Sequence, residues 1–475
     1  MANLPSLRRK HPSFVYEKYE WNISRKGLEI FFDFRLEPDI KFRPKILIER
    51  ADAKQIERMG KQNLNNLVFN LGLAEMISYW KAACPPEIII NAGPLNTEQK
   101  RWWKWLAING LGQFFYENKI NFLESGFLKI TAARTVKNEL SYSSKLKTDE
   151  KILVPMGGGK DSAATLEILK QEQKDLACFA LNPAEETVKT IKAAGCKDPI
   201  FAQRKIDSKL IELNQKGYLN GHTPFSAYLA FLTTLTAAIF GCRHIAVSNE
   251  RSSNEATLKY LGKNINHQWS KTFSFEKSFK NYSRKHLTEQ IGYFSFLRPL
   301  YEIQIAEIFS SFKKYHPIFL SCNEAHKTYS GTKKPAGKWC CGCSKCLFAF
   351  IILYPFLGEK ETVKIFGENL FENKKLLETA KELTGEKDAK PLECVGTRKE
   401  SNIAFYLSLI EAREKSPGKN LPFLLDYFEK NIFPKNKKWE KDARKIMSSW
   451  NKQNNLPKSF DKILKKHLFS KQKTP

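Results

Sequence analysis

The sequence predicts an α/β protein with a parallel-sheet core, preceded by an α+β N-terminal domain and followed by a helical C-terminal region. Two observations carry this prediction. From residue 151 onward, short apolar runs alternate with segments of helical spacing, the pattern of a parallel sheet covered by helices. Before that point, residues 28–37 and 42–50 partly alternate apolar and polar side chains, as half-buried strands do. The predicted domains are residues 1–148, 149–356 and 357–475.

Each element follows from its local pattern. In the N-terminal domain, apolar spacing predicts helices over 63–83 and 97–118, and the polar segment 141–150 reads as a linker. In the core, the strand candidates are 152–156, 176–182, 200–202, 244–247 and 317–322. Helices are predicted over 185–195 and 225–241, and beyond about 356 the chain reads as helices with charged faces.

The charge balance narrows the class of partner. The chain has 475 residues, with 78 Lys and Arg against 50 Asp and Glu, a net charge of +28. Such an excess favours an anionic partner, although solvated lysine faces would give the same count. Part of the excess lies in a basic tail after residue 430. No apolar N-terminal segment resembles a signal peptide, and the longest apolar run, 347–357, is too short to span a bilayer, which predicts a cytoplasmic protein.

A glycine-rich loop, "GGGKDS", follows the first predicted core strand. It comprises Gly157, Gly158, Gly159, Lys160, Asp161 and Ser162. The backbone N–H groups of three glycines can approach an anion closely, and the following helix N-terminus adds its dipole. The lysine adds positive charge, the serine a hydroxyl donor, and the aspartate a ligand for Mg²⁺. The loop is not a Walker A motif, because aspartate follows the lysine. The alternative is a glycine-rich turn with no ligand.

Five of the ten cysteines lie within 322–346. Cys340, Cys343 and Cys346 have the spacing C-x2-C-x2-C, and Cys322 lies upstream. Four thiolates at such positions can hold a tetrahedral Zn²⁺, which would fix the conformation of a long loop. An iron–sulfur cluster and thiols without metal are the alternatives. Cys341 is either a spare thiol or a replacement for Cys340.

Three polar stretches lie near the predicted sheet. The first, 220–227, contains His222 and is either a substrate contact or a helix-capping turn. The second, 248–256, follows a strand, so its polar side chains are candidates for Mg²⁺ or nucleotide binding, with a solvated loop as the alternative. Those side chains are Asn249, Glu250, Asn254 and Glu255. The third, 390–401, contains Glu393 and Cys394. Taken without the rest of the sequence, Cys394 is more simply interpreted as a small buried residue.

These stretches resemble known motifs. The glycine loop resembles the PP-loop of the ATP pyrophosphatases, whose usual form is S-G-G-x-D-S, with Gly157 in place of the leading serine. "GGGKDS", "NGHTPFSA", "SNERSSNE", "WCCGCSKC" and "KPLECVGT" together, in this order, resemble the UDP-N-acetylmuramoyl-L-alanyl-L-glutamate epimerases of the MurL type. The segment 72–85 also resembles the first domain of that family. The resemblance covers roughly residues 25–405, and the basic tail lies outside it.

The resemblance implies an isomerase of peptidoglycan synthesis. Its substrate would be UDP-MurNAc-L-Ala-L-Glu, whose glutamate becomes D-Glu while ATP is cleaved to AMP and diphosphate with Mg²⁺. The glycine loop, Lys160 and Ser162 would hold the phosphates, and Asp161 would support Mg²⁺. For the proton transfer, a thiol can serve as acid or base, which selects Cys394, with His222 or Glu393 as alternates.

Two rival functions remain open from the sequence. One is a PP-loop enzyme that modifies tRNA, by thiolation or lysidine formation. The positive charge and the cysteine cluster favour it, but no tRNA-binding module is recognisable, which makes nucleic acid the less favoured partner. The other rival is a non-catalytic nucleotide-binding protein. The presence of Asp161 and Ser162 argues against that reading, because a degenerate site would often lose them.

Overall fold

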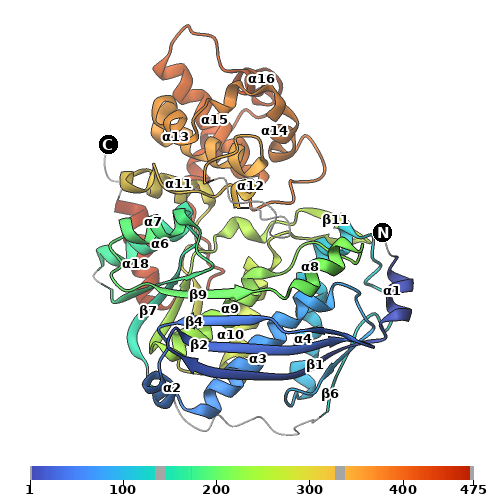
Figure 1. Cartoon of the computed structure of the whole chain (residues 1–475). Coiled ribbons are helices and arrows are strands. Elements are labelled where there is room, and N and C mark those ends of the chain that lie inside the picture. Colours follow the sequence, from blue (N-terminus) through green and yellow to red (C-terminus); the bar gives the residue numbers. More distant parts are fainter. Residues whose placement is uncertain (1–2, 134–145, 173, 327–336, 471–475) are drawn as a thin grey trace.

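The computed structural model describes residues 3–133, 146–172, 174–326 and 337–470 (Figure 1). Within these ranges one sheet of 11 strands runs through the molecule. Its members are β1 (Ser13–Ser24), β2 (Gly27–Leu36), β3 (Ile40–Phe42), β4 (Lys45–Glu49), β5 (Glu87–Ile90), β6 (Lys129–Ala132), β7 (Asp149–Pro155), β8 (Leu176–Leu181), β9 (Ile200–Lys205), β10 (Cys242–Val247) and β13 (Gly292–Ser295). A separate hairpin pairs β11 (Leu258–Tyr260) with β12 (Lys263–Ile265).

One half of the sheet is parallel, in the order β9-β8-β7-β10-β13. If these five strands are numbered 1 to 5 in sequence order, their spatial order in the sheet is 3-2-1-4-5. The direction in which successive strands are added therefore reverses between β7 and β10. Such a switch point opens a crevice at the carboxyl ends of the strands, where ligands bind in open α/β sheets. The prediction of an α/β fold with a parallel sheet is confirmed.

Helices cover both faces of this half. In β7, Leu153 belongs to one hydrophobic core, while Ile152 and Val154 belong to the other. Alternate side chains of a strand point to opposite faces, so the sheet is buried on both sides. The first core includes α3 (Lys61–Trp80), α9 (Phe225–Ile239) and α10 (Phe273–His286), and the second includes α6 (Lys160–Gln171), α7 (Glu185–Ala193) and α11 (Glu302–Ser310).

The other half of the sheet is built from N-terminal strands. β4 pairs antiparallel with β9, so one continuous sheet crosses the domain boundary predicted at residue 148. β2 buries every second side chain, as its alternating sequence predicts. The helices of this part are α1 (Leu4–Lys10), α2 (Ala53–Met59), α3, α4 (Thr97–Gly110), α5 (Gly112–Glu117) and α8 (Ser208–Gln215). The predicted helix 97–118 is thus two helices that meet at Leu111.

The C-terminal part is helical, as predicted. Its helices are α12 (Asn323–His326), α13 (Ser344–Phe366), α14 (Leu377–Thr384), α15 (Arg398–Lys415), α16 (Phe423–Asn431), α17 (Trp439–Met447) and α18 (Lys458–Ser470). Figure 1 shows α13 to α16 gathered at one end of the molecule, beyond the sheet. The apolar run 347–357 lies inside α13, which kinks at Gly358. Within the described ranges, no helix combines the length and apolar character needed to cross a bilayer.

One further expectation changes. The segment 317–322 forms no strand; the backbone N–H of Leu320 instead donates to the carbonyl of Gly158, so this segment lies across the glycine loop. Within the basic tail, α18 packs on the core through Phe460, whose ring centroid lies 4.7 Å from that of Phe294. Outside the cysteine cluster, Cys178 and Cys196 form a disulfide.

Candidate active site

The glycine loop joins β7 to α6 at the switch point of the sheet. Gly158 has a φ of +79°, and a Cβ there would lie 2.9 Å from the hydroxyl of Thr187, so only glycine fits this position. At Gly157 a Cβ would meet open space. The Ser162 hydroxyl accepts from the N–H of Gly157 at 3.4 Å and donates to the carbonyl of Gly159 at 3.2 Å. The loop and the first turn of α6 thus hold backbone donors beside one another, an arrangement suited to phosphate.

A pocket of about 400 Å³ opens over this loop. It lies between the carboxyl ends of β7 and β10, where the winding of the sheet reverses. Its walls include Gly157, Gly159, Asp161, Ser162, Ser248, Asn249, Glu250, Lys271, Ser321, Lys345 and Cys394. The glycine loop and residues of the polar stretches 248–256 and 390–401 therefore meet in one cavity.

Two serine hydroxyls in the pocket wall can act as hydrogen-bond donors, a function that the loop lacks at Gly157, where the PP-loop motif has a serine. The hydroxyl of Ser321 lies 2.7 Å from where a Cβ of Gly159 would stand. The buried hydroxyl of Ser248 has no hydrogen-bond partner among the described residues. Both can donate to a ligand in the pocket, so the loss of a side-chain donor at Gly157 leaves the pocket with other hydroxyls.

Three carboxylates converge beside the loop. Oxygens of Asp161, Glu250 and Glu302 all lie within 4.8 Å of one another. The ammonium of Lys160 contacts Asp161 and Glu302 rather than lining the pocket. Burial and the neighbouring Glu302 raise the pKa of Glu250 to about 7. Burial and the same neighbour also raise the pKa of Asp161, whereas Lys160 and Lys345 outweigh burial and lower that of Glu302.

This cluster suits a divalent cation. Carboxylate oxygens are the ligands that Mg²⁺ prefers, and three carboxylates lie close enough together here to share one ion. Sequence reasoning missed Glu302. It begins α11, after β13 at the same edge of the sheet, and only the pairing of β13 with β10 brings it to Asp161.

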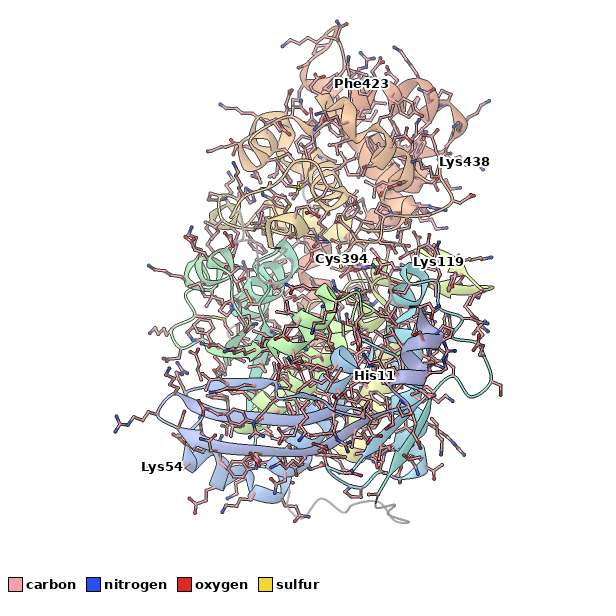
Figure 2. All side chains as sticks on the ribbon, turned by 45° about the vertical axis from the view of Figure 1, so that its right-hand side comes forward. His11, Lys54, Lys119, Cys394, Phe423 and Lys438 are labelled. Carbon is pink, nitrogen blue, oxygen red and sulfur yellow. A yellow bond between two sulfur atoms is a disulfide. The ribbon has the colours of Figure 1, made fainter. Side chains whose placement is uncertain are left out.

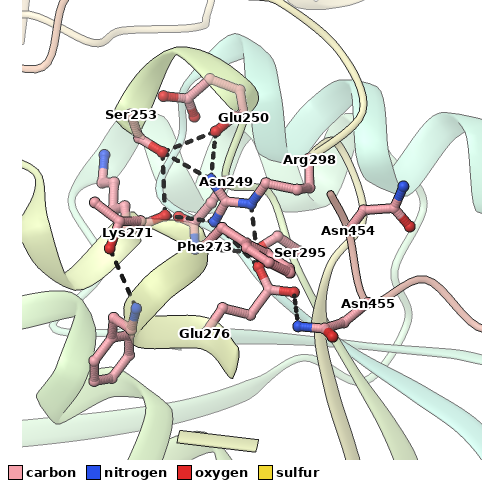
Figure 3. A network of polar contacts seen from close by, with 12 residues as sticks. Asn249, Glu250, Ser253, Lys271, Phe273, Glu276, Ser295, Arg298, Asn454 and Asn455 are labelled. Carbon is pink, nitrogen blue, oxygen red and sulfur yellow. Dashed lines mark hydrogen bonds and ion pairs between the residues drawn. The ribbon is translucent and has the colours of Figure 1, made fainter. Parts of the chain in front are cut away.

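A buried arginine positions two walls of the pocket (Figure 3). Arg298 donates to the carbonyl of Glu250 at 2.6 Å, and it also bonds the carbonyl of Lys271. Its charge is paired with Glu276, which in turn accepts from Asn455 at 3.0 Å. The segment before α18 is therefore tied to the backbone that carries Glu250 and Lys271.

The thiol of Cys394 faces the same pocket from the C-terminal part, near where the C-terminal helices meet the rest (Figure 2). The ammonium of Lys271 donates to its sulfur at 3.3 Å. Burial alone would raise the pKa of this thiol, but Lys271, a hydrogen bond with His267 and the charge of Lys345 lower it to about 5. A thiolate is the nucleophilic and basic form of cysteine, so this thiol is activated.

The remaining predicted residues lie in different surroundings. Asn249 lines the pocket and donates to Ser295 at 3.2 Å, whereas Asn254 and Glu255 do not line it. Asn254 accepts from the N–H of Phe273 at 2.8 Å, and Glu255 pairs with Lys390 at 2.9 Å.

Neither alternate to Cys394 lines the pocket. The Glu393 carboxylate accepts from the Ser344 hydroxyl at 2.8 Å and the Lys345 N–H at 2.9 Å, at the start of α13. The ring of His222 lies 4.8 Å from that of His267, centroid to centroid. Burial, aided by nearby positive groups, lowers the pKa of His222 to about 3 and keeps it neutral.

The cysteine cluster forms a second site beside α13. The sulfur of Cys346 lies 3.6 Å from the sulfur of Cys340 and 3.5 Å from the sulfur of Cys343. The sulfurs of Cys343 and Cys322 lie 4.0 Å apart. Four sulfurs around one Zn²⁺ at the usual bond length stand about 3.8 Å apart, so these residues fit a mononuclear tetrahedral ion. Cys341 is outside the cluster, since its thiol donates to the carbonyl of Phe366 at 3.2 Å.

A phosphate-type loop, buried carboxylates and an activated thiol in one pocket define an enzyme site in an α/β fold. Comparison with known proteins gives the family. The MurL N-terminal domain matches residues 6–296 and the MurL C-terminal domain matches residues 318–432. The chain therefore belongs to the MurL family.

The names of three relatives agree with this assignment. A protein of Micromonospora sp. named UDP-N-acetyl-alpha-D-muramoyl-L-alanyl-L-glutamate epimerase is 31% identical over 84% of this chain and 87% of its own length. Proteins of the same name from Salinispora tropica and Xanthomonas oryzae pv. oryzae are 30% and 31% identical, over 84% and 75% of this chain and 85% and 77% of their own lengths. The chain is thus an enzyme of the isomerase class, an epimerase.

Proposed function

We propose that this enzyme converts the terminal L-glutamate of UDP-MurNAc-L-Ala-L-Glu to D-glutamate, with cleavage of ATP to AMP and diphosphate. The observation that carries the proposal is that the glycine loop, the carboxylate cluster and the Cys394 thiol share one pocket. Such a pocket can hold a nucleotide and a proton-transfer group side by side. The names of the relatives supply the substrate.

The nucleotide end of the pocket is the glycine loop. In the proposed PP-loop role, the N–H groups of Gly157 to Gly159 and the start of α6 bind the phosphates of ATP, and Ser162 orders the loop. Asp161, Glu250 and Glu302 would hold Mg²⁺, which neutralises phosphate charge when bound. Lys160 balances part of the charge of these carboxylates from behind the pocket wall.

Adenylation makes the proton transfer feasible. An α-proton beside a carboxylate is hard to remove, because the product would carry two adjacent negative charges. In the proposed reaction, a carboxylate oxygen of the glutamate attacks the α-phosphorus of ATP, and the bond to the bridging oxygen of diphosphate breaks. The resulting acyl adenylate has no carboxylate charge, so its carbonyl can accept the electron pair of the α C–H bond. Reprotonation on the opposite face and hydrolysis release the D-glutamate form and AMP.

The thiol of Cys394 is the proposed base. It lines the pocket, and Lys271 stabilises its charged form at 3.3 Å. The proposed Zn²⁺ at Cys322, Cys340, Cys343 and Cys346 has a structural role, because four protein ligands leave no position for substrate.

The test uses purified protein with ATP, Mg²⁺ and UDP-MurNAc-L-Ala-L-Glu. Diphosphate release is followed in time, and the chirality of the glutamate is determined after acid hydrolysis. We expect diphosphate and D-glutamate, both dependent on the dipeptide substrate. The absence of both products in a folded, metal-loaded sample would contradict the proposal.

The tRNA-modifying alternative is not favoured. The relatives are named as epimerases, and α18, within the basic C-terminal segment, packs on the protein core. Addition of total tRNA to the same assay, with no expected stimulation of diphosphate release, checks this point.

A further inference from the structure

A histidine that sequence reasoning did not single out lies against the Cys394 thiol. His267 follows β12, and a hydrogen bond with His267 is among the causes that lower the pKa of the Cys394 thiol. On its other side, Nδ1 lies 2.6 Å from Oε1 of Gln113, in α5. The thiol is thus linked through one imidazole to a helix of the N-terminal part of the chain.

The proton position on this imidazole is fixed by Glu117. Nε2 of Gln113 donates to Oε1 of Glu117 at 2.8 Å, and a carboxylate can only accept from an amide. The amide oxygen of Gln113 therefore faces His267, and an oxygen of that kind can only accept. Nδ1 of the neutral His267 ring must therefore carry the proton, which leaves the free lone pair on Nε2.

We propose that Glu117, Gln113 and His267 form a relay that sets Nε2 of His267 as the proton acceptor of the Cys394 thiol. This inference rests on the proposed function and deepens it. The S–H proton moves to Nε2, and sulfur becomes a thiolate. The thiolate then accepts the α-proton of the glutamyl adenylate, as the C–H bond breaks and its electron pair moves onto the carbonyl. His267 is thus a positioning residue, and the relay prepares the base before substrate arrives.

The charged surroundings support a thiolate at this position. Lys271 donates to the sulfur at 3.3 Å, and the ammonium of Lys345 bonds the carbonyl of Cys394. Burial lowers the pKa of Lys271, but the negative charges of Cys394, Glu250 and Asp161 raise it by more. The ammonium of Lys271 therefore stays charged. Nearby Glu393 is turned to the start of α13, and neutral His222 adds no charge beside His267.

The test titrates the thiol without substrate. Full-length protein is alkylated with iodoacetamide across pH 4 to 9, and the rate at Cys394 is read by peptide mass spectrometry. The variants are His267→Gln and Gln113→Leu, with His222→Gln as the matched control and Cys394→Ser to confirm the peptide assignment. Circular dichroism checks that each variant is folded. Gln113→Leu keeps the ring of His267 and removes only the acceptor that orders it.

We expect the midpoint of the Cys394 titration to rise by about one pH unit or more in His267→Gln and Gln113→Leu, because a lost hydrogen bond to the charged form raises a pKa. The control should match the wild type. An unchanged midpoint in both relay variants would overturn the proposal. Because no substrate is needed, the titration decides the relay even if the wild type forms no D-glutamate, a result that would contradict the proposed function alone.

Discussion

The ammonium of Lys271 lies 3.3 Å from the sulfur of Cys394, although 123 positions separate the two residues in the chain. Both residues are half-buried, and a charge that is partly removed from water is stabilised by an opposite charge beside it. Each therefore stabilises the charged form of the other in the wall of the pocket. The pair lowers the pKa of the thiol and favours its ionised form near neutral pH, as the proposed removal of an α-proton requires.

The first prediction separates the two halves of the proposed reaction. Cys394→Ser removes the base and leaves the glycine loop and the carboxylates in place. We expect D-glutamate formation to fall by roughly a hundredfold or more, the usual scale for loss of a general base, while diphosphate release persists. Both products are measured in the same sample. Full epimerase activity in this variant would remove Cys394 from the mechanism.

The second prediction concerns the carboxylate cluster. Glu302→Gln keeps the shape of the side chain and removes a charge beside Asp161. We expect diphosphate release to fall by about a hundredfold at low Mg²⁺, and more Mg²⁺ to restore part of it. Glu255→Gln is the matched control, since Glu255 lies outside this pocket and should leave the rate within about twofold. Equal losses in both variants would contradict the assigned cluster.

The glycine loop could be predicted from the sequence because its signal is local. A strand, three glycines and a helix start follow one another, and the structure keeps that order in β7 and α6. The stretch 248–256 was only partly informative. Its place after β10 brings Asn249 and Glu250 to the pocket, but the 3₁₀ turn Arg251–Asn254 then redirects the chain away from it.

Other site residues carry no local signal. Lys271 ends a short 3₁₀ helix, His267 lies in a turn after β12, and Glu302 begins α11, and nothing in the sequence around them marks a site. The fold places them together through the pairing of β13 with β10 and the packing of the C-terminal part on the sheet. Their roles follow only from distances, which a single sequence does not contain.

The third prediction tests the backbone of the loop. Gly158→Ala must adopt a positive φ and bring its Cβ to 2.9 Å from Thr187, whereas Gly157→Ala meets open space. We expect Gly158→Ala to lower the free energy of unfolding by about 1–3 kcal/mol and Gly157→Ala to change it far less. Urea unfolding measures both. A larger loss at Gly157 would mean that the loop has another conformation.

The fourth prediction is a pH effect on stability. Burial lowers the pKa of His222 to about 3, below the ordinary value of 6.5, so the unfolded chain binds a proton first as pH falls. Above pH 6.5 the side chain of His222 is neutral in both the folded and the unfolded state, so it does not affect the free energy of unfolding. Below pH 6.5 only the unfolded state binds the proton, so the free energy of unfolding of the wild type falls progressively. Between pH 7.5 and 5 this loss reaches up to about 2 kcal/mol, and His222→Gln should lack it. Urea unfolding at both pH values would show equal losses if His222 were instead charged in the folded protein.

The fifth prediction concerns the cysteine cluster. Cys346→Ser removes one of four sulfurs that fit a single tetrahedral Zn²⁺, whereas Cys341→Ser changes a thiol that bonds a carbonyl outside the cluster. We expect the wild type and Cys341→Ser to contain one zinc ion per chain by elemental analysis, and Cys346→Ser to lose it. Since structural zinc contributes folding energy, the thermal midpoint should fall in Cys346→Ser and in chelator-treated wild type alike. Iron and sulfide in the purified protein would contradict the zinc assignment, and loss of metal in Cys341→Ser would move that thiol into the ligand set.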